Sequence, residues 1–177
     1  MHELAITAIG ADRPGVVAGV TGVLADLEGN LEDTSMTILG GRFAMVLIVA
    51  VPDEVGPDEV LGAMAGPAAA LGLDVAVHPS DTTSEAQEGD AWSVSVYGAD
   101  RPGIVNRFAQ VLADHEVNIT DLTTRVIGGP DRPIYAMLLD VSLPASVSAE
   151  TVRAALGTAA TELGVECSMN AADADIL

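Results

Sequence analysis

The chain has 177 residues, of which 49% are apolar and only 3% aromatic, so its core must be built from aliphatic side chains and methionine. Acidic residues outnumber basic ones by 26 to 7, which gives a formal net charge of −19. Because nucleic-acid binding depends on Lys and Arg that displace counterions from phosphates, this charge argues against direct binding of nucleic acid.

The first predicted strand contains Leu4, Ile6 and Ala8, which recur at every second position and so lie on one face. A helix is predicted after it, because apolar residues then follow helical spacing at Val16, Val20, Val23, Leu24 and Leu27. Pro14 suits a first helical turn, Asp12 suits a cap or a carboxylate that compensates the helix dipole, and Gly29 suits the helix exit.

Two further strands are predicted at Leu31 to Leu39 and Arg42 to Val51, joined by Gly40-Gly41, a dipeptide typical of tight hairpin turns. A second helix is expected from about Pro57 to Ala70, and a short strand from Leu73 to Val77. The predicted order of elements is therefore βαββαβ.

The same order is then repeated. The run Gly10 to Val17 recurs 88 residues later (98 minus 10) as Gly98 to Val105, and the second copy contains four extra residues, Pro130 to Pro133, that lengthen its hairpin loop. Its predicted elements are a strand through Trp92, Val94 and Val96, a helix through Ile104, Phe108, Val111 and Leu112, strands at Ile119 to Ile127 and Ile134 to Leu143, a helix from about Ala149 to Leu163, and a strand at Val165 to Met169.

These patterns predict an α+β fold made of two ferredoxin-like βαββαβ domains, each an antiparallel sheet covered by helices on one face. The expected domains are residues 1–79 and 91–177, and the polar segment 80–90 is the expected linker. Each copy of about 80 to 85 residues is near the lower limit for an independent core, so docking on the other copy or on a second chain is expected.

The repeated Asp-Arg-Pro-Gly turn joins a strand to a helix, where unpaired backbone N–H groups and a positive dipole end suit a small anion or a carboxylate. It is not a phosphate loop, because no Gly-Lys-Ser/Thr follows, and no third glycine completes a dinucleotide fingerprint. A turn that only begins a helix is the simpler interpretation, but the repetition, with an Asn after each helix at the same offset, favours a binding role.

In these residues the chain resembles the ACT domain family. The resemblance rests on Asp12-Arg13-Pro14-Gly15-Val16-Val17 with Asn30-Leu31, and on Asp100-Arg101-Pro102-Gly103-Ile104-Val105 with Asn118-Ile119. It covers nearly the whole chain and extends to tandem ACT proteins of the glycine cleavage system transcriptional repressor family. The resemblance also extends to regulatory domains attached to amino-acid enzymes, to formyltetrahydrofolate deformylases and to nucleotidyltransferase sensors. All of these add a catalytic domain, for which we expect no room in this chain.

The resemblance implies that an amino acid, glycine or a similar effector, binds where two ACT units meet. Carried over to this sequence, the ligand-binding residues are Asp12, Arg13, Pro14, Gly15 and Asn30 in the first copy and Asp100, Arg101, Pro102, Gly103 and Asn118 in the second. The Asp and Asn side chains would accept from the ammonium group, and N–H groups around Gly15 or Gly103 would receive the carboxylate.

Residues suited to catalysis or metal binding are few. His2, His78 and His115 have no counterpart in the other copy and no partner at ligand spacing. Cys167, the only cysteine, rules out an internal disulfide, and its counterpart Val75 favours a small buried hydrophobe. Met45 and Met137 are expected in the core, and the acidic cluster Asp53, Glu54, Asp58 and Glu59 is expected to compensate a helix dipole.

We therefore expect a protein that is not an enzyme and needs no cofactor or metal. Two hypotheses remain: an amino-acid sensor that regulates transcription through a partner protein, and a structural interaction module that needs no ligand. A homodimer is compatible with both. No stretch of about 20 apolar residues and no signal-peptide pattern is present, which predicts a cytoplasmic location without membrane contact.

Overall fold

A computed structural model describes residues 1–80, 89–128 and 133–172. The chain divides into two compact units, Met1–Ser84 and Glu85–Leu177, each with its own core. Most of the expected linker and three of the four extra hairpin residues, Pro130 to Arg132, lie outside the described residues. Strand β5 begins at Gly89, so the last two residues of the expected linker lie in the first strand of the second unit.

The elements of the first unit are β1 His2–Ala11, α1 Val16–Asp26, β2 Asn30–Leu39, β3 Arg42–Val51, α2 Pro57–Leu71 and β4 Leu73–Pro79. Those of the second unit are β5 Gly89–Gly98, α3 Ile104–Asp114, β6 Asn118–Ile127, β7 Ile134–Pro144, α4 Ala149–Leu163 and β8 Val165–Ala171. This order confirms the predicted βαββαβ repeat, with strands a few residues longer than the alternation alone indicated.

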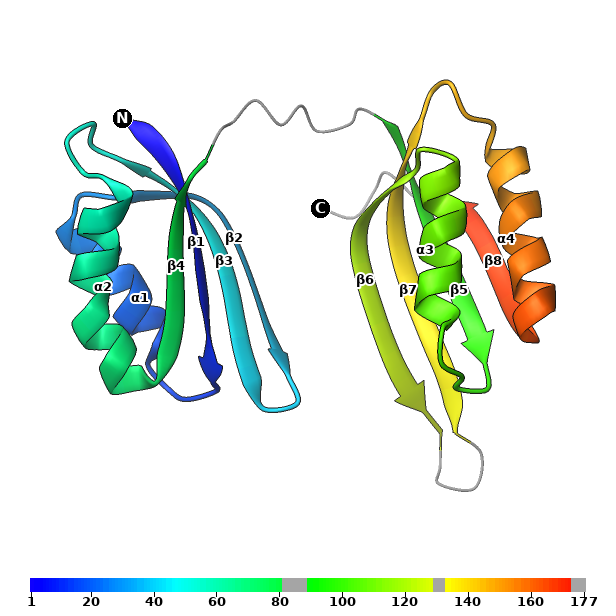
Figure 1. Cartoon of the computed structure of the whole chain (residues 1–177), viewed down its shortest axis with the longest axis horizontal. Coiled ribbons are helices and arrows are strands. Elements are labelled where there is room, and N and C mark those ends of the chain that lie inside the picture. The colour runs from blue at the N-terminus through cyan, green and yellow to red at the C-terminus, as the bar shows by residue number, and fades with distance from the viewer. Residues whose placement is uncertain (81–88, 129–132, 173–177) are drawn as a thin grey trace. The chain divides into compact units, whose positions relative to one another are not determined.

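Each unit contains one antiparallel four-stranded sheet, with the strand order β2-β3-β1-β4 in the first and β6-β7-β5-β8 in the second. In both units the two helices lie on the same side of the sheet, which leaves its other face open (Figure 1). The predicted ferredoxin-like fold is thereby confirmed.

The cores lie between the helices and the sheet. Leu4, Ile6 and Ala8 of β1 are fully buried, as the alternating pattern predicted, and Val16, Val20 and Leu24 of α1 cover them. In the second unit Phe108 and Leu112 of α3 hold the equivalent places. The matched methionines Met45 and Met137 are buried, which confirms the prediction that they fill the core.

The start of each first helix differs from the prediction. Helix α1 begins at Val16, with Gly15 as its cap, so Pro14 lies before the first helical turn and not in it. The N–H of Val16 bonds to the carbonyl of Arg13 at 3.4 Å, and Gly15 has φ 91° and ψ −5°. Pro followed by a glycine at positive φ is the signature of a type II turn, and this turn displaces the helix by two residues.

Asp12 and Asp100 are consequently not helix caps. Neither α1 nor α3 has a side-chain cap or an acidic residue in its first turn, because Gly15 and Gly103 occupy the cap position. The role predicted for Gly29 is also wrong, since the left-handed residue after α1 is Glu28, at φ 56°. Gly29 is instead required for space, because a Cβ there would lie 3.0 Å from the carbonyl oxygen of Leu24.

Candidate functional site

The strand–helix turn presents an open helix start. The first bond that closes α1 runs from the N–H of Gly19 to the carbonyl of Gly15, at 2.8 Å. The N–H groups of Val17 and Ala18 precede it, so they have no acceptor within the helix. Because no carboxylate caps this end, the positive pole of the helix dipole faces outward.

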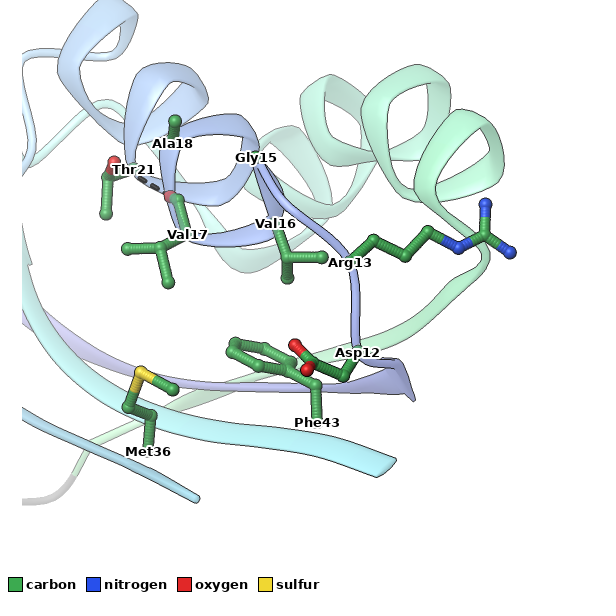
Figure 2. A pocket seen from close by; sticks show the side chains of 9 residues that line it. All are labelled: Asp12, Arg13, Gly15, Val16, Val17, Ala18, Thr21, Met36 and Phe43. Atoms are coloured by element: carbon green, nitrogen blue, oxygen red, sulfur yellow. Dashed lines mark hydrogen bonds between the residues drawn. The ribbon is translucent and has the colours of Figure 1, made fainter. Parts of the chain in front are cut away.

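A groove lies between this helix start and the neighbouring strands. We call it the first groove; it has a volume of about 440 Å³ and is lined by Asp12, Arg13, Gly15, Val16, Val17, Ala18, Thr21, Met36 and Phe43. Figure 2 shows the side chains of Val17, Met36 and Phe43 around the space between α1 and the sheet, with the Asp12 carboxylate beside Phe43. Its volume falls in the range of small-molecule sites.

The groove exists because α1 does not cover β2. All ten residues of β2 are exposed, although Met36 and Ile38 share the helix-facing side of the sheet with the buried Met45 and Phe43 opposite them. The side wall of the groove is therefore a partly exposed thioether, with Met36 at 46% exposure, and its floor is the buried ring of Phe43.

The second unit repeats the arrangement. A groove of about 500 Å³, the second groove, is lined by Arg101, Gly103, Ile104, Val105, Asn106, Ala109 and Tyr135. Gly103 has φ 95° and ψ −5°, almost the values of Gly15, and its carbonyl accepts from Arg107 N–H at 2.9 Å. The two copies of the turn thus share one geometry.

The two arginines of the turns serve the fold. Nη1 of Arg101 donates to the carbonyl of Leu163 at 3.3 Å, at the end of α4, where a cation is favourable to the helix dipole. Arg13 lies beside Gly72, the C-terminal cap of α2, and Figure 2 shows its guanidinium pointing away from the groove. Their stems border the grooves, while their charges are directed to the second helix of each unit.

Asn30 lies far from the first groove within its own unit. It begins β2 opposite Ala50, whereas Met36 of the groove wall is six residues further along the strand, a distance of about 20 Å at the rise of a strand. Its amide nitrogen donates to Oε1 of Glu32 at 2.7 Å. Asn118 begins β6 in the same way. One unit therefore does not bring its Asn and its Asp together.

The His, Cys, Asp and Glu side chains of the described residues form no group that could hold a metal ion. Nδ1 of His115 lies 2.8 Å from the carbonyl of Val111, which ties the ring to its own helix. Asp53 pairs with the N-terminal ammonium group at 2.7 Å, and this contact lowers the pKa of its carboxyl. Asp58 and Glu59 do lie in the first turn of α2, so the expected dipole compensation applies to them but not to Asp53.

Cys167 is half-buried against the second core, as a small hydrophobe would be, and burial raises the pKa of its thiol to about 11.

Within the described parts of the chain, no helix is long and apolar enough to cross a membrane.

Three side chains that shape the grooves lie outside the predicted binding motif. Met36, Phe43 and Tyr135 come from strands more than twenty residues beyond the turns, and strand pairing brings them near. Phe43 of β3 is paired with Gly10 of β1, and Tyr135 of β7 is paired with Gly98 of β5. The one sequence signal that could have identified Phe43 and Tyr135 is the aromatic residue at the matched position just after each hairpin loop.

The ACT domain family model matches the chain twice, at residues 2–78 and 93–170. The chain belongs to this family, as a tandem of two ACT domains. It is 27% identical to the glycine cleavage system transcriptional repressor of Escherichia coli K12, over 96% of this chain and 90% of that protein. Family membership and this full-length likeness support a regulatory role.

Two solved structures share the fold over nearly their whole length. An unknown protein from Galdieria sulphuraria matches with a TM-score of 0.83 and 24% identity, covering 97% of this chain and 98% of that one. A candidate glycine cleavage system transcriptional repressor matches with a TM-score of 0.69 and 17% identity, covering 96% of each chain. At these identities the likeness establishes the fold alone.

Proposed function

We propose that this protein is a regulatory sensor that binds a free amino acid in its strand–helix grooves and transmits binding to a partner protein. The observation that carries the proposal is the uncapped helix start beside a carboxylate. In the first groove, the N–H groups of Val17 and Ala18 suit the ligand's carboxylate, and Asp12 suits its ammonium group. The role is binding and not catalysis.

Glycine is the first ligand to test, because the Escherichia coli relative is named for the glycine cleavage system. Calorimetric titration of the full chain with glycine and a panel of other amino acids tests the proposal. In thermal unfolding, a ligand at a hundred times its dissociation constant stabilises the folded state by about 2.7 kcal/mol. If no amino acid at millimolar concentration gives heat or a thermal shift, the sensor proposal is wrong.

A second function, association without a ligand, is favoured by the apolar edge of the first sheet. Ile38 and Leu39 of β2 are exposed by 52% and 74%, and a bare edge strand is a template for pairing with another chain. We propose this edge as the contact to a partner protein or to a second copy in a homodimer. Sedimentation of the chain with Ile38→Lys tests it, since a charge on an edge strand opposes pairing.

A further inference from the structure

The walls of the two grooves differ in chemistry at matched positions. Where the first groove has Ala18 on the helix, the second has Asn106, which is also exposed and lines the groove. Across the groove, the strand residue Met36 is replaced in the second unit by Thr124, which is paired with Met137 as Met36 is with Met45. At these two positions the first groove has a methyl group and a thioether, whereas the second unit has the amide of Asn106 in its groove and the Thr124 hydroxyl, which hydrogen-bonds to Tyr135 of the groove. One matched pair runs the other way, because Thr21 of the first groove is replaced by Ala109 in the second.

The aromatic floors differ in the same direction. Phe43 is 2% exposed and has no polar atom, whereas its counterpart Tyr135 is 9% exposed and carries a hydroxyl. Burial raises the pKa of Tyr135, the side-chain hydrogen bond with Thr124 opposes this, and the Asp100 carboxylate adds to the rise. The phenol therefore remains protonated at neutral pH and can act as a donor.

The polar groups left in the first groove do not offset this difference. The hydroxyl of Thr21 donates to the carbonyl of Val17 at 2.9 Å, within its own helix (Figure 2). The Arg13 guanidinium is turned toward α2. Asp12 and the backbone N–H groups suit the ammonium and carboxylate groups that all free amino acids share. The side chain of the ligand is therefore left to contact mainly apolar surface.

We propose that the two grooves select different amino acids: the first an apolar side chain, such as that of methionine, and the second a side chain that forms hydrogen bonds, such as that of asparagine. The inference rests on the proposed sensor function and adds ligand class to it. Burial of the ligand's methylene groups against an apolar wall makes the free energy of binding more favourable. A polar ligand group placed there loses its hydrogen bonds to water and finds no replacement. A sensor of this kind responds to two metabolites at once.

Site-resolved titration of the full chain tests the proposal. In ¹⁵N–¹H NMR spectra, the amides of Gly15 and Val17 report on the first groove, and those of Gly103 and Val105 on the second. We expect L-methionine to reach half-saturation of the first groove at a concentration about tenfold below that of L-asparagine. The order is reversed at the second groove.

Reciprocal double variants connect the preference to the walls. Ala18→Asn with Met36→Thr should remove or reverse the preference at the first groove and leave the second unchanged; Asn106→Ala with Thr124→Met should do the opposite. All four positions are exposed, so the fold should tolerate the changes. Val46→Thr, on the open face of the first sheet, is the matched control and should change neither groove.

Two results would overturn the inference. If both amino acids bind each groove with equal midpoints, or if the double variants leave the preferences intact, the selectivity is wrong while the sensor function stands. If L-methionine, L-asparagine and glycine all leave these amides unmoved at millimolar concentration, both proposals fail together.

Discussion

The backbone N–H of Asp12 donates to the carbonyl of Gly41 at 3.1 Å, which joins the end of β1 to the β2–β3 hairpin. The bond uses only main-chain atoms, so it fixes the position of Asp12 and leaves the carboxylate beside Phe43 at the groove (Figure 2). The side chain and the backbone of Asp12 therefore have separate roles, and a substitution can separate them.

Asp12→Asn should weaken amino-acid binding at the first groove without lowering the stability of the unliganded protein. A hydrogen bond to a charged group contributes about 1.5 to 3 kcal/mol, so the affinity should fall by roughly tenfold or more. The melting temperature should hold, because Gly15 and not Asp12 occupies the helix cap. Asp100→Asn is the parallel test in the second unit. A fall in melting temperature with unchanged affinity would assign Asp12 to the fold alone.

Gly15→Ala and Gly22→Ala should have opposite effects on stability. A Cβ at either position meets no atom within 4 Å, so packing does not enter the comparison. Gly15 has φ +91°, where a side chain costs about 1 to 2 kcal/mol, whereas Gly22 lies inside α1, where Ala is better by about 0.5 to 1 kcal/mol. Urea unfolding measures both. Equal effects of the same sign would mean that the turn relaxes and that its type II geometry is not maintained.

The elements of this fold could be predicted because the hydrophobic period changes sharply along the chain. The helix Ala149–Leu163 and the strand Arg42–Val51 have the bounds that the pattern indicated. The turn before α1 was harder to predict from the sequence, because a proline fits both a first helical turn and the second position of a type II turn. The glycine after Pro14 distinguishes them, since it permits the positive φ that the turn requires.

The candidate site could be predicted only in part, for a similar reason. Asp12 and Gly15 are close in sequence, so their motif locates half of the groove. Met36 and Phe43 approach only when β2, β3 and β1 pair in register, which is a property of the tertiary fold. The place of Asn30 at the opposite end of β2 follows from the same register and could not be read from its offset in the sequence.

Asn30→Ala should leave ligand binding at the first groove unchanged. Within its unit Asn30 lies about 20 Å along the strand from the groove wall at Met36, and its amide donates to the side chain of Glu32. The bond is at the surface, so the free energy of unfolding should change by no more than about 0.5 kcal/mol. Calorimetry on the full chain measures both quantities. Lost affinity would instead mean that Asn30 reaches the ligand from another ACT domain, as the family resemblance implies.

The raised pKa of the Cys167 thiol should lower the free energy of unfolding at high pH. Burial raises its pKa from 9.0 to about 11, so the folded state holds the proton more tightly than the unfolded chain. The protonated thiol's contribution to the free energy of unfolding is complete below about pH 9 and disappears as the pH rises to about 11. Cys167→Val, which introduces the residue found at the matched position Val75, should remove this part of the pH dependence in urea unfolding. Parallel curves for both proteins would contradict it.

The purified chain should not bind DNA at physiological salt, so that any effect on transcription requires a partner protein. All seven basic side chains are arginines, against 26 acidic residues. Arg107 pairs with Glu162 at 2.8 Å, and Arg153 donates to the carbonyl of Met169 while its guanidinium lies 5.7 Å from the Trp92 ring. Few cations are therefore available to displace counterions from phosphates. A gel-shift titration with and without amino acid measures this, and a shift that weakens with added salt would show direct binding.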